Sequence, residues 1–305
     1  MKSVIITGAS GMIGRTLIDY LLSKEIKILA IVRNREYANN YFPNNKNLEI
    51  IKCNLSELSN LKLKKKYDTF YHLAWAGTFG EERNQVFDQT LNIKYTLDAV
   101  ELANRSGCKT FIGTGSQAEY GRVNEILTPE TKINPENGYG VGKLAAGMMS
   151  RILANKYNIK HIWTRILSVY GPYDNERTMI MSSIISMLEN NESPEYTKGE
   201  QNWDYIYSKD AAKALYLLGE KGKNNKTYLV ASGKSKKLSE YIKELRDNIN
   251  PGIELKLGYK EYSDKQVMNL EADISELKKD TGFKPEYSFK EGIKETIKWY
   301  KESSD

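Results

Sequence analysis

Tyr139 and Lys143 are the pair in this chain best suited to proton chemistry. A free tyrosine hydroxyl has a pKa of about 10, and a neighbouring ammonium group favours its ionised form. Residues four apart on a helix share one face, so we expect Lys143 to approach Tyr139 and lower the pKa of its hydroxyl. Ser116 adds a hydroxyl that can hydrogen-bond a substrate oxygen gaining negative charge. Each of these residues alone is common in structural roles, so their meaning depends on the elements that position them.

Three glycines near the start of the chain, Gly8, Gly11 and Gly14, follow the apolar run of residues 4–7. The pyrophosphate of a dinucleotide needs bare backbone and the amino end of a helix facing it. In such a turn, the first glycine lets the chain leave the strand and the second leaves room for the phosphates. The third lets the helix pack against the sheet. The glycines predict a dinucleotide-binding turn, and with the tyrosine, lysine and serine they predict an enzyme that moves a hydride and a proton.

The residues that follow the second apolar run indicate which dinucleotide binds. Enzymes that use NAD usually carry an acidic residue there, which accepts hydrogen bonds from the adenosine ribose. This chain has Arg33, Asn34 and Arg35 instead. Because guanidinium groups pair with phosphate through forked donors, we predict NADP(H), with Arg33 on the 2′-phosphate and NAD(H) less favoured. The alternative is that the arginines merely face solvent.

Strand-like and helix-like segments alternate in the first part of the chain. This alternation predicts an α/β fold with a doubly wound parallel sheet. Predicted strands are residues 4–7, 28–32, 48–52, 70–74, 111–113, 161–165 and 227–230, and predicted helices are residues 91–103, 139–157, 180–188, 211–218, 238–249, 275–280 and 289–300.

The predicted helices after Pro172 indicate a second, smaller unit. We predict a dinucleotide-binding domain over residues 1–172, which also receives parts of residues 203–232, and a mostly helical substrate lobe over residues 173–305. The ligand cleft is expected between the two units.

Composition narrows the class of protein. Of 305 residues, 40% are hydrophobic and 28% charged, which is enough for a packed core. The net charge of +6 is scattered, which fits an anionic small ligand and disfavours nucleic acid. Cys53 and Cys108 share no metal-ligand spacing, so we expect free thiols and no metal. No apolar run approaches the roughly 18 residues of a membrane span, and we expect a soluble cytoplasmic protein without membrane or nucleic-acid partners.

Several motifs occur in the order typical of one enzyme family. Residues 7–14 match its cofactor turn, residues 72–76 a strand motif beside the cofactor, residues 116–121 its serine loop, residues 139–143 its catalytic pair and residues 165–172 a further signature. On these motifs the chain resembles the extended short-chain dehydrogenases/reductases, the NAD-dependent epimerase/dehydratase family. The resemblance implies a Rossmann-type fold, catalysis by Ser116, Tyr139 and Lys143, a nucleotide-linked sugar as substrate, and a homodimer.

The resemblance also implies binding residues. For the cofactor these are Gly8, Ser10, Gly11, Met12, Ile13, Gly14, Arg33, Arg35, Asn54, Leu55, Leu73, Ala74, Trp75, Ala76, Asn92, Thr114, Tyr139, Lys143, Ile166 and Ser168. For the substrate they are Thr78, Ser116, Gln117, Arg177, Thr197, Gln201, Trp203 and Tyr262. An arginine that many members place before Asp204 is replaced by Trp203. A later arginine, which pairs with the substrate phosphates in many members, has no clear equivalent around Lys265 and Gln266, so the phosphates must use other groups.

The residues after Ser116 separate the reactions of the family. Members that remove water resemble one another in a Thr-Asp-Glu run whose carboxyl groups act as acid and base, whereas this chain has Ser116-Gln117-Ala118. Glu119 lies one position further on and is expected to point elsewhere. Other details look most like a bacterial branch that includes CDP-abequose synthase. The prediction is therefore NADPH-dependent reduction of the 4-keto group of a nucleotide-linked 4-keto-6-deoxysugar.

Two alternatives stay open. A nucleotide-sugar 4-epimerase would hold NAD tightly and consume none. A non-catalytic dinucleotide-binding sensor belongs to another class, but such relatives usually lose the tyrosine or the lysine, and this chain has both Tyr139 and Lys143.

Overall fold

A parallel sheet forms the centre of the molecule. The computed structural model describes residues 1–39 and 41–304, and in these ranges seven strands pair in the order β11-β6-β5-β4-β1-β2-β3. The order reverses between β1 and β4, and ligands bind at such switch points beyond the carboxyl ends of the strands. The strands are β1 (Ser3–Thr7), β2 (Lys27–Val32), β3 (Leu48–Lys52), β4 (Thr69–His72), β5 (Thr110–Ser116), β6 (Lys160–Ile166) and β11 (Lys226–Val230).

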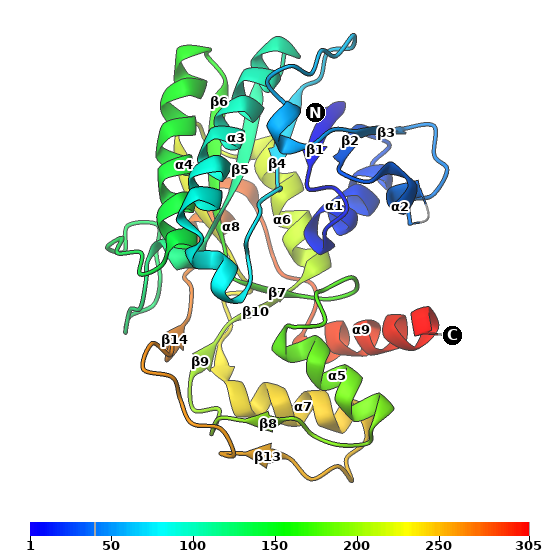
Figure 1. Ribbon diagram of the computed structural model, residues 1–305, viewed down its shortest axis with the longest axis vertical. Helices are drawn as coiled ribbons and strands as arrows, with labels where there is room; N and C mark the ends of the chain where they lie inside the picture. Colours follow the sequence, from blue (N-terminus) through cyan, green and yellow to red (C-terminus); the bar gives the residue numbers. More distant parts are fainter. Residues whose placement is uncertain (40, 305) are drawn as a thin grey trace.

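Helices cover both faces of this sheet (Figure 1). Side chains alternate between the faces of a strand, so Val4 and Ile6 pack with α1 and α6, whereas Ile5 lies in the opposite core with residues of α3 and α4. The helices of these layers are α1 (Met12–Leu22), α3 (Val86–Arg105), α4 (Gly138–Lys156), α6 (Ser208–Lys221) and α8 (Ser275–Thr281), with the short α2 (Arg35–Asn39) beside β3.

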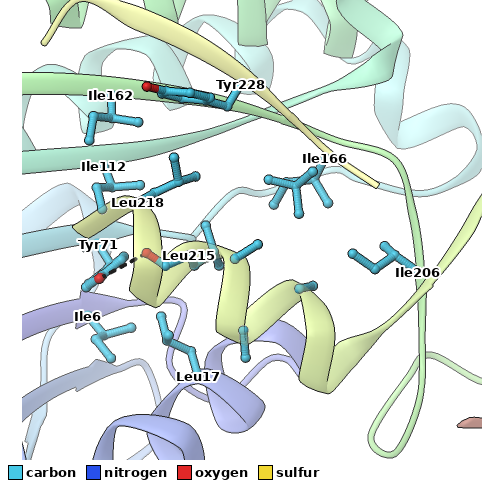
Figure 2. Close-up of a cluster of buried hydrophobic side chains, with 14 of the residues drawn as sticks. Ile6, Leu17, Tyr71, Ile112, Ile162, Ile166, Ile206, Leu215, Leu218 and Tyr228 are labelled. Atoms are coloured by element: carbon cyan, nitrogen blue, oxygen red, sulfur yellow. Dashed lines mark hydrogen bonds between the residues drawn. The ribbon is translucent and has the colours of Figure 1, made fainter. Parts of the chain in front are cut away.

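The core under α6 ties the late part of the chain to the early strands (Figure 2). Ile6 and Ile112 project from the sheet toward Leu215 of α6, and all three side chains are fully buried. The Tyr71 hydroxyl donates a hydrogen bond to the Leu215 carbonyl at 3.2 Å. Burial of each such aliphatic side chain contributes about 1.5–3 kcal/mol, so α6 and β11 are integral parts of the sheet layers.

A second, smaller group of elements lies beyond the carboxyl edge of the sheet (Figure 1). Its core contains Ile184, Ile242 and Ile293, one from each of three helices. The group comprises α5 (Met179–Glu189), α7 (Leu238–Ile249), α9 (Phe289–Ser304) and the short strands β7 (Ser168–Tyr170), β8 (Glu195–Tyr196), β9 (Asn202–Trp203), β10 (Tyr205–Tyr207), β12 (Lys236–Lys237), β13 (Lys256–Leu257) and β14 (Asn269–Leu270).

The predicted α/β fold with a parallel sheet is confirmed, and the predicted elements agree closely with the observed ones. Strand 48–52 and helix 238–249 coincide with β3 and α7. Helix α3 begins at Val86 rather than at residue 91, because its first turn exposes Val86 and Phe87 and so lacks an inward apolar face. The two-residue strands were not predicted, since they are too short to show a period. None of the described helices is long and apolar enough to cross a membrane.

Candidate active site

The turn between β1 and α1 accepts only glycine at two of its three glycine positions. Gly8 has φ of +71°, and a Cβ there would lie 2.6 Å from the backbone nitrogen of Ala74. A Cβ on Gly14 would lie 2.3 Å from the Gly8 carbonyl oxygen. At Gly11 a Cβ would meet only that same oxygen, at 3.5 Å. The protein itself therefore does not require a bare backbone at Gly11, and the free space there faces the cavity described below.

The amino end of α1 is open to a ligand. Its N-cap, Gly11, provides no side-chain hydrogen bond, and the first turn contains no acidic residue. The first amides of a helix lack intrahelical acceptors and carry partial positive charge, which suits an anion. Arg15 closes the turn from behind, because its Nε donates to the Ser10 carbonyl at 2.8 Å. These features fit the pyrophosphate of a dinucleotide.

A cavity of about 500 Å³ runs from this turn across the carboxyl ends of β1, β4, β5 and β6. It brings together thirteen of the predicted residues: Gly8, Gly11, Met12, Ile13, Gly14, Leu73, Trp75, Thr78, Thr114, Ser116, Tyr139, Lys143 and Ile166. It is also lined by residues that the sequence did not single out: Phe79, Gly115, Leu167, Val169, Tyr173, Asp174, Asn175 and Thr178. Most of these residues lie within the 165–172 signature or follow it directly. Their closeness to this signature is the sequence feature from which they could have been predicted.

Tyr139 lies in the first turn of α4, partly exposed to the cavity. Asn137 caps this helix by accepting a hydrogen bond from the Gly140 amide at 2.8 Å, which fixes the turn that carries the tyrosine. Burial raises the pKa of Tyr139, while a hydrogen bond with Ser116 and the positive charge of Arg83 act in the opposite direction. The tyrosine is thus a weak acid held beside the serine hydroxyl.

The closest contacts of the Lys143 ammonium group are with Thr114 and Trp75, and Tyr139 lies farther away. The Lys143 side chain is buried, and Nζ donates to the Thr114 carbonyl at 2.6 Å and lies 4.0 Å from the centre of the Trp75 ring. The same nitrogen is 5.7 Å from the centre of the Tyr139 ring. Burial lowers the pKa of Lys143 to about 7, so near neutral pH it is charged only part of the time. The i, i+4 spacing places both side chains in the same cavity lining.

Ser116 ends β5 and begins the short helix η3 (Gln117–Glu119), which contains the predicted Gln117. The Ser116 hydroxyl accepts from the Ala118 amide at 3.2 Å, and the Ser116 amide donates to Glu119 Oε1 at 2.9 Å. The other Glu119 oxygen pairs with Arg165 Nε at 2.7 Å, and the Glu119 side chain is fully buried. Glu119 therefore points away from the cavity, as its position in the sequence led us to expect, and holds the serine loop.

Other predicted cofactor residues lie outside the cavity lining. Asn92 is buried and exchanges two hydrogen bonds with the backbone of Ala76, so it supports the strand motif. Asn54 caps the turn that contains Leu55. Arg33 and Arg35 are exposed and follow the end of β2. Ser10 and Ala74 contribute backbone atoms around the glycine turn. The Ser168 hydroxyl accepts a hydrogen bond from Trp203 Nε1 at 2.8 Å.

The predicted substrate residues of the second group of elements lie apart from this cavity lining. Tyr262 accepts from the Glu200 amide at 3.0 Å and donates to Gln201 Oε1 at 3.4 Å. Thr197 accepts from the Gly199 amide at 3.4 Å. Arg177 is closer to the cavity, because its guanidinium lies 5.0 Å from the ring centre of Phe79.

Comparison with known proteins assigns the family. The model of the NAD dependent epimerase/dehydratase family matches residues 4–231, from β1 through the end of β11. The chain belongs to this family. It is an enzyme of the extended short-chain dehydrogenase/reductase type, whose members act on nucleotide sugars.

Individual relatives are similar over nearly their whole length. An uncharacterized protein of Methanocaldococcus jannaschii is 25% identical over 321 residues, covering 100% of this chain and 98% of the relative. The UDP-N-acetylglucosamine 4-epimerase of Methanobrevibacter ruminantium M1, solved with UDP-N-acetylmuramic acid, has 29% identity and a TM-score of 0.88 over 99% of each chain. The dTDP-glucose 4,6-dehydratase of Bacillus anthracis, solved with NAD, shares the fold at 19% identity and a TM-score of 0.83, over 100% of this chain and 98% of that one.

The arrangement joins an anion-binding turn to a proton-transfer pair in one cavity. Gly11 leaves space for the phosphates, and the amino end of α1 offers them backbone amides. The Ser116 and Tyr139 hydroxyls line another part of the same cavity. A bound nicotinamide dinucleotide would supply hydride between these two parts. Tyr139 can exchange a proton with a substrate oxygen, and Ser116 can hold that oxygen by a hydrogen bond.

Proposed function

We propose that this enzyme reduces the 4-keto group of a nucleotide-linked 4-keto-6-deoxysugar with NADPH. The observation that carries the proposal is the shared cavity, in which Ser116 and Tyr139 lie together while the carboxylate of Glu119 is turned away. A dehydratase needs acidic and basic groups near the serine, and Gln117 and Ala118 provide neither. The Ser116 and Tyr139 hydroxyls that remain support proton transfer to a single substrate oxygen.

The residues have separate roles in this reaction. Ser116 donates a hydrogen bond to the substrate oxygen as its negative charge grows, and Tyr139 gives that oxygen its proton. Lys143, held on the Thr114 carbonyl, orients the cofactor ribose and relays the replacement proton, a task that its pKa of about 7 suits. Gly8 and Gly14 allow the close packing of the turn, and Gly11 leaves its backbone open to the phosphates.

The preference for NADP(H) rests on the end of β2. Val32 is the last residue of this strand, and the exposed Arg33 and Arg35 follow it where NAD enzymes usually carry a carboxylate. The measurement is KM for NADPH and for NADH in the same assay. A clear preference for NADH would contradict this part of the proposal, and R33S should raise KM for NADPH alone.

A 4-epimerase is the second candidate, and one observation favours it. The UDP-N-acetylglucosamine 4-epimerase shares 29% identity with this chain over 99% of both lengths. Its reaction needs the same tyrosine and serine, first to take a proton from a hydroxyl and then to return it. An epimerase forms product without net consumption of dinucleotide, whereas a reductase consumes one equivalent.

We also propose that the enzyme is a cytoplasmic homodimer that pairs through α3 and α4. These helices lie side by side on one face of the sheet (Figure 1). Several of their large apolar side chains are exposed. The exposed side chains are Val86, Phe87, Leu91, Val141, Met148, Met149 and Ile152. Exposed apolar side chains on two adjacent helices are typical of a protein interface.

The experiment that decides among these candidates is a substrate panel. Nucleotide-linked 4-ketosugars are incubated with NADPH while its absorbance is followed, and nucleotide hexoses are incubated without added dinucleotide while their epimers are separated. Consumption of NADPH in the first arm supports the reductase. Epimer formation in the second arm alone would replace it with the epimerase, and inactivity in both arms would contradict both.

A further inference from the structure

Arg83 comes from a part of the chain that no motif marked. It lies in the short helix η2 (Gly80–Asn84), in the connection between β4 and α3. This turn is docked on the start of α4, since the Gly138 amide donates to Asn84 Oδ1 at 3.1 Å. A Cβ on Gly138 would lie 2.9 Å from the Arg83 carbonyl oxygen, so the backbones pack too closely there for any other residue. Arg83 is thus fixed against the turn that carries Tyr139.

The guanidinium of Arg83 covers the face of the tyrosine ring. Its Cζ lies 4.7 Å from the centre of the Tyr139 ring, within the distance at which a cation and an aromatic face attract each other. Trp75 meets the same ring edge-on with centroids 6.2 Å apart. The tyrosine ring therefore contacts both an indole and a positive charge.

Arg83 is not held there by ordinary structural contacts. Its Nε is buried and has no hydrogen-bond partner, and no carboxylate of the described residues forms an ion pair with the guanidinium. A buried polar atom without a partner costs free energy, so an arginine serving only to support the turn would be expected to find an acceptor. The exposed Glu82 is the adjacent residue in the same turn and does not pair with it.

The other cation near Tyr139, Lys143, lies farther from the tyrosine ring than Arg83 does. Lys143 Nζ donates a hydrogen bond to the Thr114 carbonyl and lies 5.7 Å from the centre of the Tyr139 ring. Its pKa of about 7 leaves it neutral for part of the time, whereas an arginine stays charged throughout the working pH range. Arg83 is therefore the nearer cation to the tyrosine ring, at 4.7 Å against 5.7 Å for Lys143.

We propose that Arg83 is a positioning residue for Tyr139, whose fixed charge over the ring stabilises the phenolate left when the tyrosine has given up its proton. The inference rests on the proposed function, in which Tyr139 transfers that proton. The O–H bond of Tyr139 breaks, its proton forms the new O–H bond of the substrate alcohol, and the electron pair stays on the phenolate until a solvent proton replaces the lost one. In the epimerase direction the same charge assists the first proton removal.

Two substitutions separate the charge of Arg83 from its bulk. Arg83→Met keeps an unbranched stem over the ring without charge, and Arg83→Lys keeps a charge without the planar group. Glu82→Gln is the matched control, because it changes the charge of the same turn by one unit through an exposed side chain. Each variant is also made in a Tyr139→Phe background, so that the ultraviolet difference spectrum of the pair isolates the ionisation of Tyr139 from that of the other tyrosines.

The expected result is that R83M ionises Tyr139 at clearly higher pH than the wild type, whereas E82Q does not and R83K lies close to the wild type. In the active enzyme, kcat of R83M at pH 7 falls about tenfold with KM changed less than about twofold, and the limb of the pH–rate profile assigned to Tyr139 moves to higher pH. An unchanged phenol titration in R83M overturns the proposal. A shift in R83K as large as in R83M does so as well, because charge would then not be the cause. The spectroscopic titration needs no turnover. If the proposed function is wrong, R83M still shows the expected shift of the Tyr139 titration, but the wild-type enzyme has no activity in the proposed reaction.

Discussion

The behaviour of single residues in this protein depends on what surrounds them. Tyr139 and Lys143 have the spacing of a proton-transfer pair, yet burial moves their pKa values in opposite directions, up for the tyrosine and down to about 7 for the lysine. Glu119 could have served as a base by its type, but Arg165 and the Ser116 amide hold it away from the cavity. Residue type sets what chemistry is available, and the local environment selects which of it occurs.

Replacing Tyr139 with Phe removes the proton that the substrate oxygen must receive. We expect kcat to fall at least about 100-fold, since general acid catalysis typically contributes that much, while dinucleotide affinity stays within about threefold of the wild type. Steady-state kinetics and a fluorescence titration with the dinucleotide measure the two quantities. Tyr259→Phe is the control, because Tyr259 is exposed and is not part of the cavity lining. Turnover retained in Y139F would remove the tyrosine from its assigned role.

His161 should make the folded state sensitive to mild acid. It stacks between Phe111 and Trp163 and hydrogen-bonds Ser150, and burial lowers its pKa to about 3. In the unfolded chain its pKa is about 6.5, so its contribution to stability is present above that pH and is lost progressively as pH falls toward 3.

Between pH 7 and pH 5 the protonation of His161 alone should lower the free energy of unfolding by about 2 kcal/mol. His161→Gln should lessen the decrease by that amount, whatever its stability at pH 7. Urea unfolding at both pH values measures it. An equal decrease in the wild type and in H161Q would show that the histidine titrates normally in the folded protein.

The residues of the candidate active site lie at the ends of helices and strands rather than in their middles. Gly8 and Gly11 lie between β1 and α1, Ser116 lies where β5 meets η3, and Tyr139 lies in the first turn of α4. All four residues are at the carboxyl edge of the sheet, where the last residues of parallel strands lie close together. The site is thus assembled by the ends of elements that the cores on both faces hold in register.

The two glycines of the turn should respond differently to the same substitution. Gly8→Ala places a Cβ 2.6 Å from the Ala74 nitrogen at a positive φ, so it should lower the free energy of unfolding by about 2 kcal/mol or more. Gly11→Ala meets only one atom at 3.5 Å and should leave the free energy of unfolding almost unchanged.

Dinucleotide affinity should nevertheless fall in G11A, because the added methyl occupies the space assigned to the phosphates. Chemical denaturation and dinucleotide titration of both variants provide the comparison. Full dinucleotide affinity in a stable G11A would mean that the phosphates do not approach this part of the turn.

The molecule as a whole combines two groups of elements around one cavity. The chain leaves the sheet after β6, builds α5, and returns with α6 and β11 before it completes the second group. Arg15 of α1 links the groups, because its guanidinium lies 4.6 Å from the ring centre of Tyr173, which in turn packs on Trp299 of α9. Tyr173 has φ of +69°, an uncommon conformation for a side-chain-bearing residue that often accompanies functional loops.

The outer face of α3 and α4 leads to a prediction about assembly. Ile152 is 70% exposed on α4 and should lie in the dimer interface, so Ile152→Glu should convert the dimer into a monomer by burying an unpaired charge. Sedimentation velocity measures the mass in solution. Ile126→Glu is the matched control, because Ile126 is 55% exposed but lies outside both helices. A wild-type chain that sediments as a monomer at micromolar concentration would contradict the proposed interface.

The sequence by itself determined the alternation of strands and helices, the glycine turn and the tyrosine–lysine spacing. These features depend on neighbours within one or two helical turns, and β3 and α7 were therefore predicted to the residue. The division into domains and the roles of the individual site residues remain predictions. Short strands such as β9 and β14 escaped prediction because only pairing between distant segments creates them.

Only the tertiary structure decided the electrostatics of the site. Three features of the site depend on segments that lie far apart in the chain. They are the lowered pKa of Lys143, the buried ion pair between Glu119 and Arg165, and the position of Arg83 over the Tyr139 ring. Burial and charge act through space within a few ångströms, and the packing of the parallel sheet and its helices determines which groups come that close.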